Sequence, residues 1–144
     1  MTTISRRDLN LLVATALAAT ASGRAYAQTA PYGSQGVKAT VIMDPDLAGF
    51  SPQTTRLTLV EIASGNAIPR HMHPFAQEIV FVLDGTLVID VEGQGTKNLK
   101  AGETLLLPAG LPHFPRATNA SAKVLAIHSI TDKTKPFRVE LPGS

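Results

Sequence analysis

The stretch that decides the fold reads Gly65-Asn66-Ala67-Ile68-Pro69-Arg70-His71-Met72-His73-Pro74-Phe75-Ala76-Gln77-Glu78-Ile79-Val80-Phe81-Val82-Leu83-Asp84-Gly85. Alternate residues of a strand share a face, so His71 and His73 direct both imidazoles the same way. Pro74 suits a turn, which predicts that Glu78 folds back beside the two histidines on the adjacent strand. Two imidazoles and a carboxylate on one face indicate a site for a first-row metal ion.

A second stretch supplies another histidine. It reads Gly102-Glu103-Thr104-Leu105-Leu106-Leu107-Pro108-Ala109-Gly110-Leu111-Pro112-His113, which predicts a strand, a Pro-Gly turn and a histidine that opens the next strand. In an antiparallel barrel, residues far apart in sequence meet across the interior. His113 can therefore reach His71, His73 and Glu78.

The rest of the chain predicts an all-β fold. Short aliphatic and β-branched runs alternate with Gly-containing turns, as in an antiparallel β-barrel or a two-sheet jelly roll. A turn is expected at Asp84-Gly85, between two separate strands. The expected strands span residues 37–43, 54–62, 68–73, 77–83, 86–91, 96–100, 104–107, 113–116, 122–130 and 137–141.

Together, the two histidine-containing stretches resemble the two motifs of the cupin superfamily. The first motif, Gly…His-x-His…Glu…Gly, is matched by Gly65, His71, His73, Glu78 and Gly85. The second, Gly…Pro-x-Gly…His…Asn, is matched by Gly102, Pro108, Gly110 and His113, with Ala117 where the Asn is expected. The resemblance implies a single jelly-roll domain over residues 28–144 that binds one divalent metal ion through His71, His73, Glu78 and His113.

The chemistry of these donors restricts the metal. The chain has no cysteine, so thiolate ligands are excluded. Three imidazoles and one carboxylate leave one or two positions for water or substrate on a five- or six-coordinate ion. Iron or manganese is favoured, while zinc, nickel and copper also suit these ligands. The alternative is a barrel without metal, which would leave buried polar groups unpaired at a cost of several kcal/mol.

Residues 1–27 have the pattern of a cleaved export signal. Arg6 and Arg7 precede an apolar run over residues 11–21, and Ala25-Tyr26-Ala27 is a small-residue cleavage site. The run is too short to span a membrane, so no stable membrane anchor is expected in the mature form. The paired arginines resemble a bacterial twin-arginine signal, which implies a periplasmic or secreted protein exported after folding and metal loading. Residues 28–36 are expected to form a flexible arm.

Charge and hydrophobic pattern limit the partners. The residues after the leader carry ten Lys and Arg against ten Asp and Glu, which gives no case for nucleic acid. The runs 79–83 and 124–127 are apolar on both faces, so the outer face of the barrel needs a cover. A second copy of the chain would supply it, which predicts a homodimer, and the N-terminal arm is the alternative cover.

Four other residues are candidates for the pocket or its surroundings. His128 shares a face with Val124 and Ile130, so it either lies near the pocket, supporting a ligand or carrying a proton, or is a structural histidine. Phe75 and Phe114 are close to ligands in sequence and could shape the pocket mouth, although core aromatics are more common. Arg70 alternates with the ligands and is expected to be a surface or interface charge.

Two functions fit this pattern. The first is a metal-dependent enzyme acting on a small molecule, by dioxygenation or by another metal-assisted reaction such as decarboxylation or isomerisation, all of which the cupin resemblance implies. The second is a binding protein that captures a small ligand at the metal without turnover. Beyond the ligands and His128, the sequence identifies no certain inward-facing acid or base.

Overall fold

The computed structural model describes residues 28–29, 35–47, 49 and 51–143. The expected leader over residues 1–27 and much of the expected arm lie outside these residues. The regular structure of the described part is entirely β. Its strands are β1 (Gln28–Thr29), β2 (Val37–Met43), β3 (Thr54–Ile62), β4 (Asn66–Ala67), β5 (His71–Met72), β6 (Ala76–Val91), β7 (Gly95–Lys100), β8 (Thr104–Leu107), β9 (His113–Ala117), β10 (Ala122–Ile130) and β11 (Val139–Glu140).

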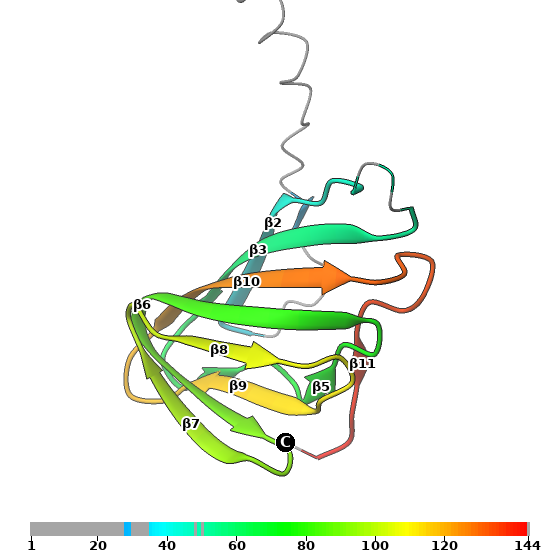
Figure 1. Ribbon diagram of the computed structural model, residues 1–144. Coiled ribbons are helices and arrows are strands. Elements are labelled where there is room, and N and C mark those ends of the chain that lie inside the picture. The colour runs from blue at the N-terminus through cyan, green and yellow to red at the C-terminus, as the bar shows by residue number, and fades with distance from the viewer. Residues whose placement is uncertain (1–27, 30–34, 48, 50, 144) are drawn as a thin grey trace, which may run out of the picture.

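The strands form two antiparallel sheets that curl around a common interior (Figure 1). The first sheet contains β1, β2, β3, β10, the first half of β6 and β8. The second sheet contains β7, the second half of β6, β9, β4, β5 and β11. The predicted all-β antiparallel jelly-roll fold is confirmed.

A single long strand, β6, joins the two sheets. The sequence predicts two strands separated by a turn at Asp84-Gly85, and this detail is wrong, because β6 runs through both residues. β6 bends sharply along its length (Figure 1), and its pairing changes from the first sheet to the second after Gly85. Gly85 has φ of 75°, and a Cβ atom added to it would lie 1.9 Å from the Ser121 carbonyl oxygen. Glycine alone tolerates this conformation and this approach of β10. The bend carries β6 from one sheet into the other.

The core lies between the inner faces of the two sheets. Inward positions alternate along each strand, as the pleat requires. In β6, Val80 and Val82 face the interior from the first sheet, and Leu87, Ile89 and Val91 face it from the second, as their alternation in the sequence predicts. β10 adds Val124 and Ala126 opposite them. This apolar packing fills one end of the barrel, whereas buried polar residues occupy the other end.

The outer face of the first sheet is also apolar. Ile79 of β6 lies beside Ile127 of β10 on one side and Leu106 of β8 on the other. Leu106 is 52% exposed, and Leu83 further along β6 is 43% exposed. The described part of the arm, Gln28–Thr29, pairs with the edge of β2. This surface therefore has the composition of an interface.

Candidate metal centre

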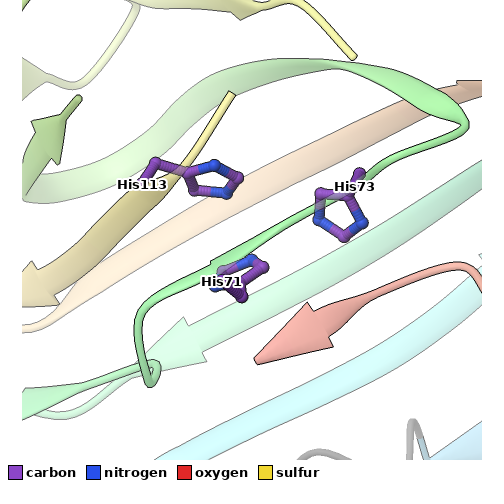
Figure 2. A group of neighbouring side chains, drawn as sticks. All are labelled: His71, His73 and His113. Atoms are coloured by element: carbon purple, nitrogen blue, oxygen red, sulfur yellow. The ribbon is translucent and has the colours of Figure 1, made fainter. Parts of the chain in front are cut away.

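Three histidines converge from the second sheet (Figure 2). His71 of β5 and His113 of β9 are cross-strand partners, so their side chains leave the sheet on the same face. His73 follows β5, and its ring centroid lies 5.1 Å from that of His71 and 5.7 Å from that of His113. All three side chains are buried. Neighbouring strands thus bring together histidines more than forty positions apart in the chain.

Each of these three imidazoles is oriented by a backbone carbonyl. The Nδ1 atoms of His71, His73 and His113 lie 2.8, 2.8 and 3.0 Å from the carbonyl oxygens of Pro69, Phe137 and Leu111 respectively. Because a carbonyl oxygen only accepts, Nδ1 carries the proton and donates it. The Nε2 lone pair of each ring is consequently available for a metal ion, an arrangement that is usual for metal-binding histidines.

Glu78 approaches from the opposite side of the interior. The sequence places it on the strand adjacent to the histidine pair, but Glu78 lies in the first-sheet half of β6, where it pairs with Leu107 and His128. Its Oε2 atom is 3.2 Å from Nε2 of His113 and 3.6 Å from Nε2 of His73. The connection after Pro74 therefore crosses between the sheets and does not form a hairpin. The four predicted ligands nevertheless come together.

Burial determines the protonation states at this site. Desolvation, assisted by the charges of His113 and Arg138, lowers the pKa of His71 to about 2. Desolvation also lowers the pKa of His73 to about 4, although Glu78 opposes the change. For Glu78, burial acts to raise the pKa, but the neighbouring His128 and His113 hold it well below its usual value. At neutral pH His71 and His73 are thus neutral and Glu78 is ionised, which are the forms that bind metal ions.

These donors fit a divalent metal ion. The ligating atoms of His71, His73 and His113 lie within 4.8 Å of one another, and so do those of His73, Glu78 and His128. Glu78 Oε2 is buried without a hydrogen-bond partner among the described residues. An unpaired buried carboxylate oxygen is costly, and a cation held between it and the imidazoles would satisfy it. Among the described residues, the imidazoles of His73, His113 and His128 lie within 3.6 Å of this carboxylate.

His128 lies inside the barrel at this site. Its side chain is 3% exposed, and Nε2 is 3.6 Å from Glu78 Oε1. Neither ring nitrogen has a hydrogen-bond partner within the described part of the chain. Of the positions considered from the sequence, His128 thus occupies the interior one, beside Glu78.

Two phenylalanines are expected at the pocket mouth, and the structure places them in different surroundings. Phe114 alternates with inward-facing His113 on β9, and its ring is covered by the Arg116 guanidinium, 5.3 Å from the ring centroid, on the outer face. Phe114 therefore faces away from the three histidines. Phe75 is 38% exposed in the connection before β6, where its carbonyl accepts bonds from Thr131. Arg70 forms an ion pair with Glu92, which confirms it as a surface charge.

The C-terminal segment supplies a phenylalanine that the sequence does not identify. The Phe137 ring packs against His73 and His128, with centroid separations of 4.6 and 4.7 Å. Arg56 covers the same ring at 4.3 Å and is held by Asp44. The segment reaches the site because β11 pairs with β5, a contact between strands nearly seventy residues apart. No local sequence pattern predicts the pairing of β11 with β5.

A small cavity lies on the interior side of Glu78 and His113. It measures about 30 Å³ and is otherwise lined by apolar side chains, among them Val80, Leu87 and Ala126. This exceeds the roughly 10–15 Å³ that a cavity needs to hold one water molecule. A larger depression of about 440 Å³ lies near Lys38, Glu61 and Ala122, at the end of the barrel away from the histidines. The buried site thus has room beside it for a very small molecule only.

Comparisons with known proteins agree with this architecture. The family model of the Cupin domain matches residues 58–128, which span the histidine motifs and extend to His128. The chain belongs to the cupin superfamily. A germin-like protein of Arabidopsis thaliana, subfamily 2 member 2, is 32% identical over 103 residues, covering 68% of this cupin and 43% of the relative. This cupin therefore spans less than half the length of that curated relative.

Solved structures share the fold at lower identity. A cupin-like protein from Thermotoga maritima has a TM-score of 0.62 and 21% identity, with coverage of 79% of this cupin and 86% of that chain. A recombinant oxalate oxidase in complex with glycolate has a TM-score of 0.59 and 24% identity, covering 80% of this cupin and 60% of that chain. These similarities establish the cupin fold.

Proposed function

We propose that this cupin is a metal-dependent enzyme acting on a small, oxygen-rich molecule. The observation that carries the proposal is the buried cluster of His71, His73 and His113, with Glu78 Oε2 lying 3.2 Å from Nε2 of His113 and 3.6 Å from Nε2 of His73. One divalent ion, with iron or manganese favoured, would be held by these four side chains. Such an ion, when bound with an open position, polarises an oxygen of the substrate or binds dioxygen.

The protein contributes orientation and exclusion of water. The carbonyls of Pro69, Phe137 and Leu111 fix the three imidazoles before any ligand arrives. Phe137 covers His73 from the side of the C-terminal segment. Water is kept from a site whose ligands are at most 7% exposed, which strengthens every electrostatic contact inside it.

The reaction class is proposed to be dioxygenation, with decarboxylation or isomerisation as the other metal-assisted possibilities. An oxalate oxidase that binds glycolate has this fold, so small hydroxy and keto acids are the substrates to test first. A binding protein without turnover is the second candidate. It is favoured by the scarcity of additional buried acids and bases around the four ligands and His128 within the described residues.

The deciding experiment combines metal analysis with assay of the mature protein. Metal content is measured by mass spectrometry after purification from the export compartment, and oxygen uptake is followed with oxalate, glycolate and related acids. About one iron or manganese per chain together with turnover supports the enzyme. Stoichiometric metal with ligand binding and no turnover supports the binding protein. Protein that takes up no divalent ion under any loading condition refutes both.

Location and assembly are parts of the same proposal. The twin-arginine-like start of the chain supports export to the periplasm or beyond. Among the described residues, no helix is long and apolar enough to cross a membrane. The exposed apolar face formed by Ile79, Leu106 and Ile127 supports a homodimer, with a second copy as its cover. A Leu106→Glu variant that remains dimeric by light scattering would contradict this arrangement.

A further inference from the structure

The four histidines of the site fall into two kinds. Three of them, His71, His73 and His113, have Nδ1 bonded to a backbone carbonyl and a single free nitrogen, Nε2. His128 is as deeply buried, yet Nδ1 and Nε2 both lack a partner in the described residues. A buried imidazole without a hydrogen-bond or metal partner lowers the stability of the fold. This side chain therefore requires a partner that the described protein atoms around it do not provide.

The position of His128 relative to Glu78 indicates what that partner is. The two oxygens of Glu78 face different histidines: Oε2 faces His73 and His113, and Oε1 lies 3.6 Å from Nε2 of His128. A separation of 3.6 Å is too long for a hydrogen bond. It is, however, a usual separation between two atoms bound to the same ion, and the ligating atoms of His73, Glu78 and His128 all lie within 4.8 Å of one another.

We propose that His128 is a fifth protein ligand of the metal ion. The ion would then be held by four imidazoles and one carboxylate, leaving one open position on a six-coordinate centre. This inference rests on the proposed function, since it requires that the site binds a metal ion at all. It extends that proposal because His128 would bind the ion directly and would not merely orient another ligand.

The strand arrangement favours this role. His128 and Glu78 are direct cross-strand partners on β10 and β6, so both side chains leave the first sheet on its inner face. Phe137 packs edge-on against the His128 ring, and His73 lies 4.5 Å away by ring centroids. The imidazole is thus enclosed by two rings and a carboxylate. Its freedom to turn away from the ion is small.

The number of imidazoles bound to the ion tests whether His128 is a ligand. The mature protein is loaded with Mn²⁺, and pulsed electron paramagnetic resonance with and without ¹⁵N-histidine labelling counts the histidine nitrogens on the ion. We expect four in the wild type and three in His128→Asn, with manganese affinity weakened at least 10-fold, roughly the loss caused by removing a supporting group alone. Thr58→Val, which alters another buried polar residue lacking a partner in the described part of the chain, should retain four.

The number of histidine nitrogens bound to the ion in the wild type tests the proposal by itself. The proposal can therefore be refuted even if the His128→Asn variant does not fold. Three histidine nitrogens in the wild type would overturn the inference and leave the proposed metal-dependent function standing. The same count in wild type and in a folded His128→Asn variant would also overturn it. If the wild type binds no Mn²⁺ or Fe²⁺, the proposed function fails first and the fifth ligand fails with it.

Discussion

The two sides of the metal site are built differently. On the second sheet, His71, His73 and His113 are each fixed by a backbone carbonyl and present one nitrogen. On the first sheet, Glu78 and His128 are equally buried, but Glu78 Oε2 and both nitrogens of His128 have no hydrogen-bond partner in the described residues. One side is organised in advance, and the other leaves buried polar atoms that a bound ion would satisfy. The pre-oriented histidines of the second sheet should therefore contribute most of the affinity for a metal ion. Glu78 and His128 of the first sheet should determine how many protein ligands that ion has.

Removing a fixed histidine should have the largest effect. A His73→Ala variant is expected to lose stoichiometric metal and, with it, all stabilisation by added metal, because binding free energy contributes directly to folding. Metal analysis and thermal unfolding with and without Mn²⁺ measure both losses. Phe75→Ala, at an exposed neighbouring position, is the matched control and should keep the metal. Unchanged metal content in His73→Ala would contradict the ligand set.

Changing the bend between the two sides should cost stability without removing a donor. In Gly85→Ala the new Cβ would meet the Ser121 carbonyl oxygen in a conformation with positive φ. We expect a loss of about 3 kcal/mol in the free energy of unfolding, from strain and a forced shift of β10. Gly93→Ala also has positive φ but no atom within 4 Å of its added Cβ, so it should cost less. Equal losses in urea unfolding would show that the close approach is unimportant.

Lowering the pH should reduce the folding stability of the metal-free protein, through His71 and His73. The pKa of His71 is about 2 and that of His73 about 4 in the folded state, against 6.5 for an ordinary histidine. Below pH 6.5 the unfolded chain therefore takes up protons that the folded chain does not, and stability falls as the pH decreases toward 4. The expected slope is roughly 1 kcal/mol per pH unit for each histidine.

Urea unfolding of the metal-free protein at several pH values between 7.5 and 4.5 measures this slope. The double variant His71→Asn, His73→Asn lacks both titrating groups and should show a clearly flatter dependence. A wild-type stability that stays constant from pH 6.5 to 4.5 would show that these imidazoles are not held neutral by burial.

The smallest of these effects is expected at the contact that joins both sides. Phe137 touches His73 and His128, and a Phe137→Ala variant should lose about 1–2 kcal/mol of stability, less than a fully buried phenylalanine would. Metal affinity should fall by roughly 10-fold because two rings lose their packing. Phe137→Leu should recover most of the stability. Isothermal titration with Mn²⁺ provides the affinities, and identical values for all three proteins would exclude a supporting role.

Much of this architecture could be predicted from the sequence. Alternation and Gly-containing turns gave the bounds of β2, β3, β8 and β10, because strand period and turn chemistry are local properties. The cupin-like spacing of His71, His73, Glu78 and His113 identified the four side chains that meet. Local sequence patterns gave a wrong prediction at Asp84-Gly85, where the backbone conformation depends on a tertiary contact. The approach of Ser121 to Gly85 turns an apparent hairpin into one bent strand, and that contact is tertiary.

The unpredicted parts of the site depend on pairing between distant strands. Phe137 reaches the histidines only because β11 pairs with β5. Phe114 is adjacent in sequence to a ligand but points outward, since a strand alternates its faces. His128 could be placed on one face of its strand, yet only the register of β10 with β6 shows that this face is opposite Glu78. Sheet register over such separations is not encoded in any short motif.

The carbonyl of Phe137 has a consequence for biosynthesis. It is the group that orients His73, and it lies 64 positions further along the chain. All of the proposed donors, including His128, precede it in the order of synthesis. In a nascent chain that ends before Phe137, every donor is therefore present but this carbonyl does not yet orient His73. If the site binds a metal ion, the complete set of oriented donors forms only after the segment around Phe137 has been made and β11 has paired with β5.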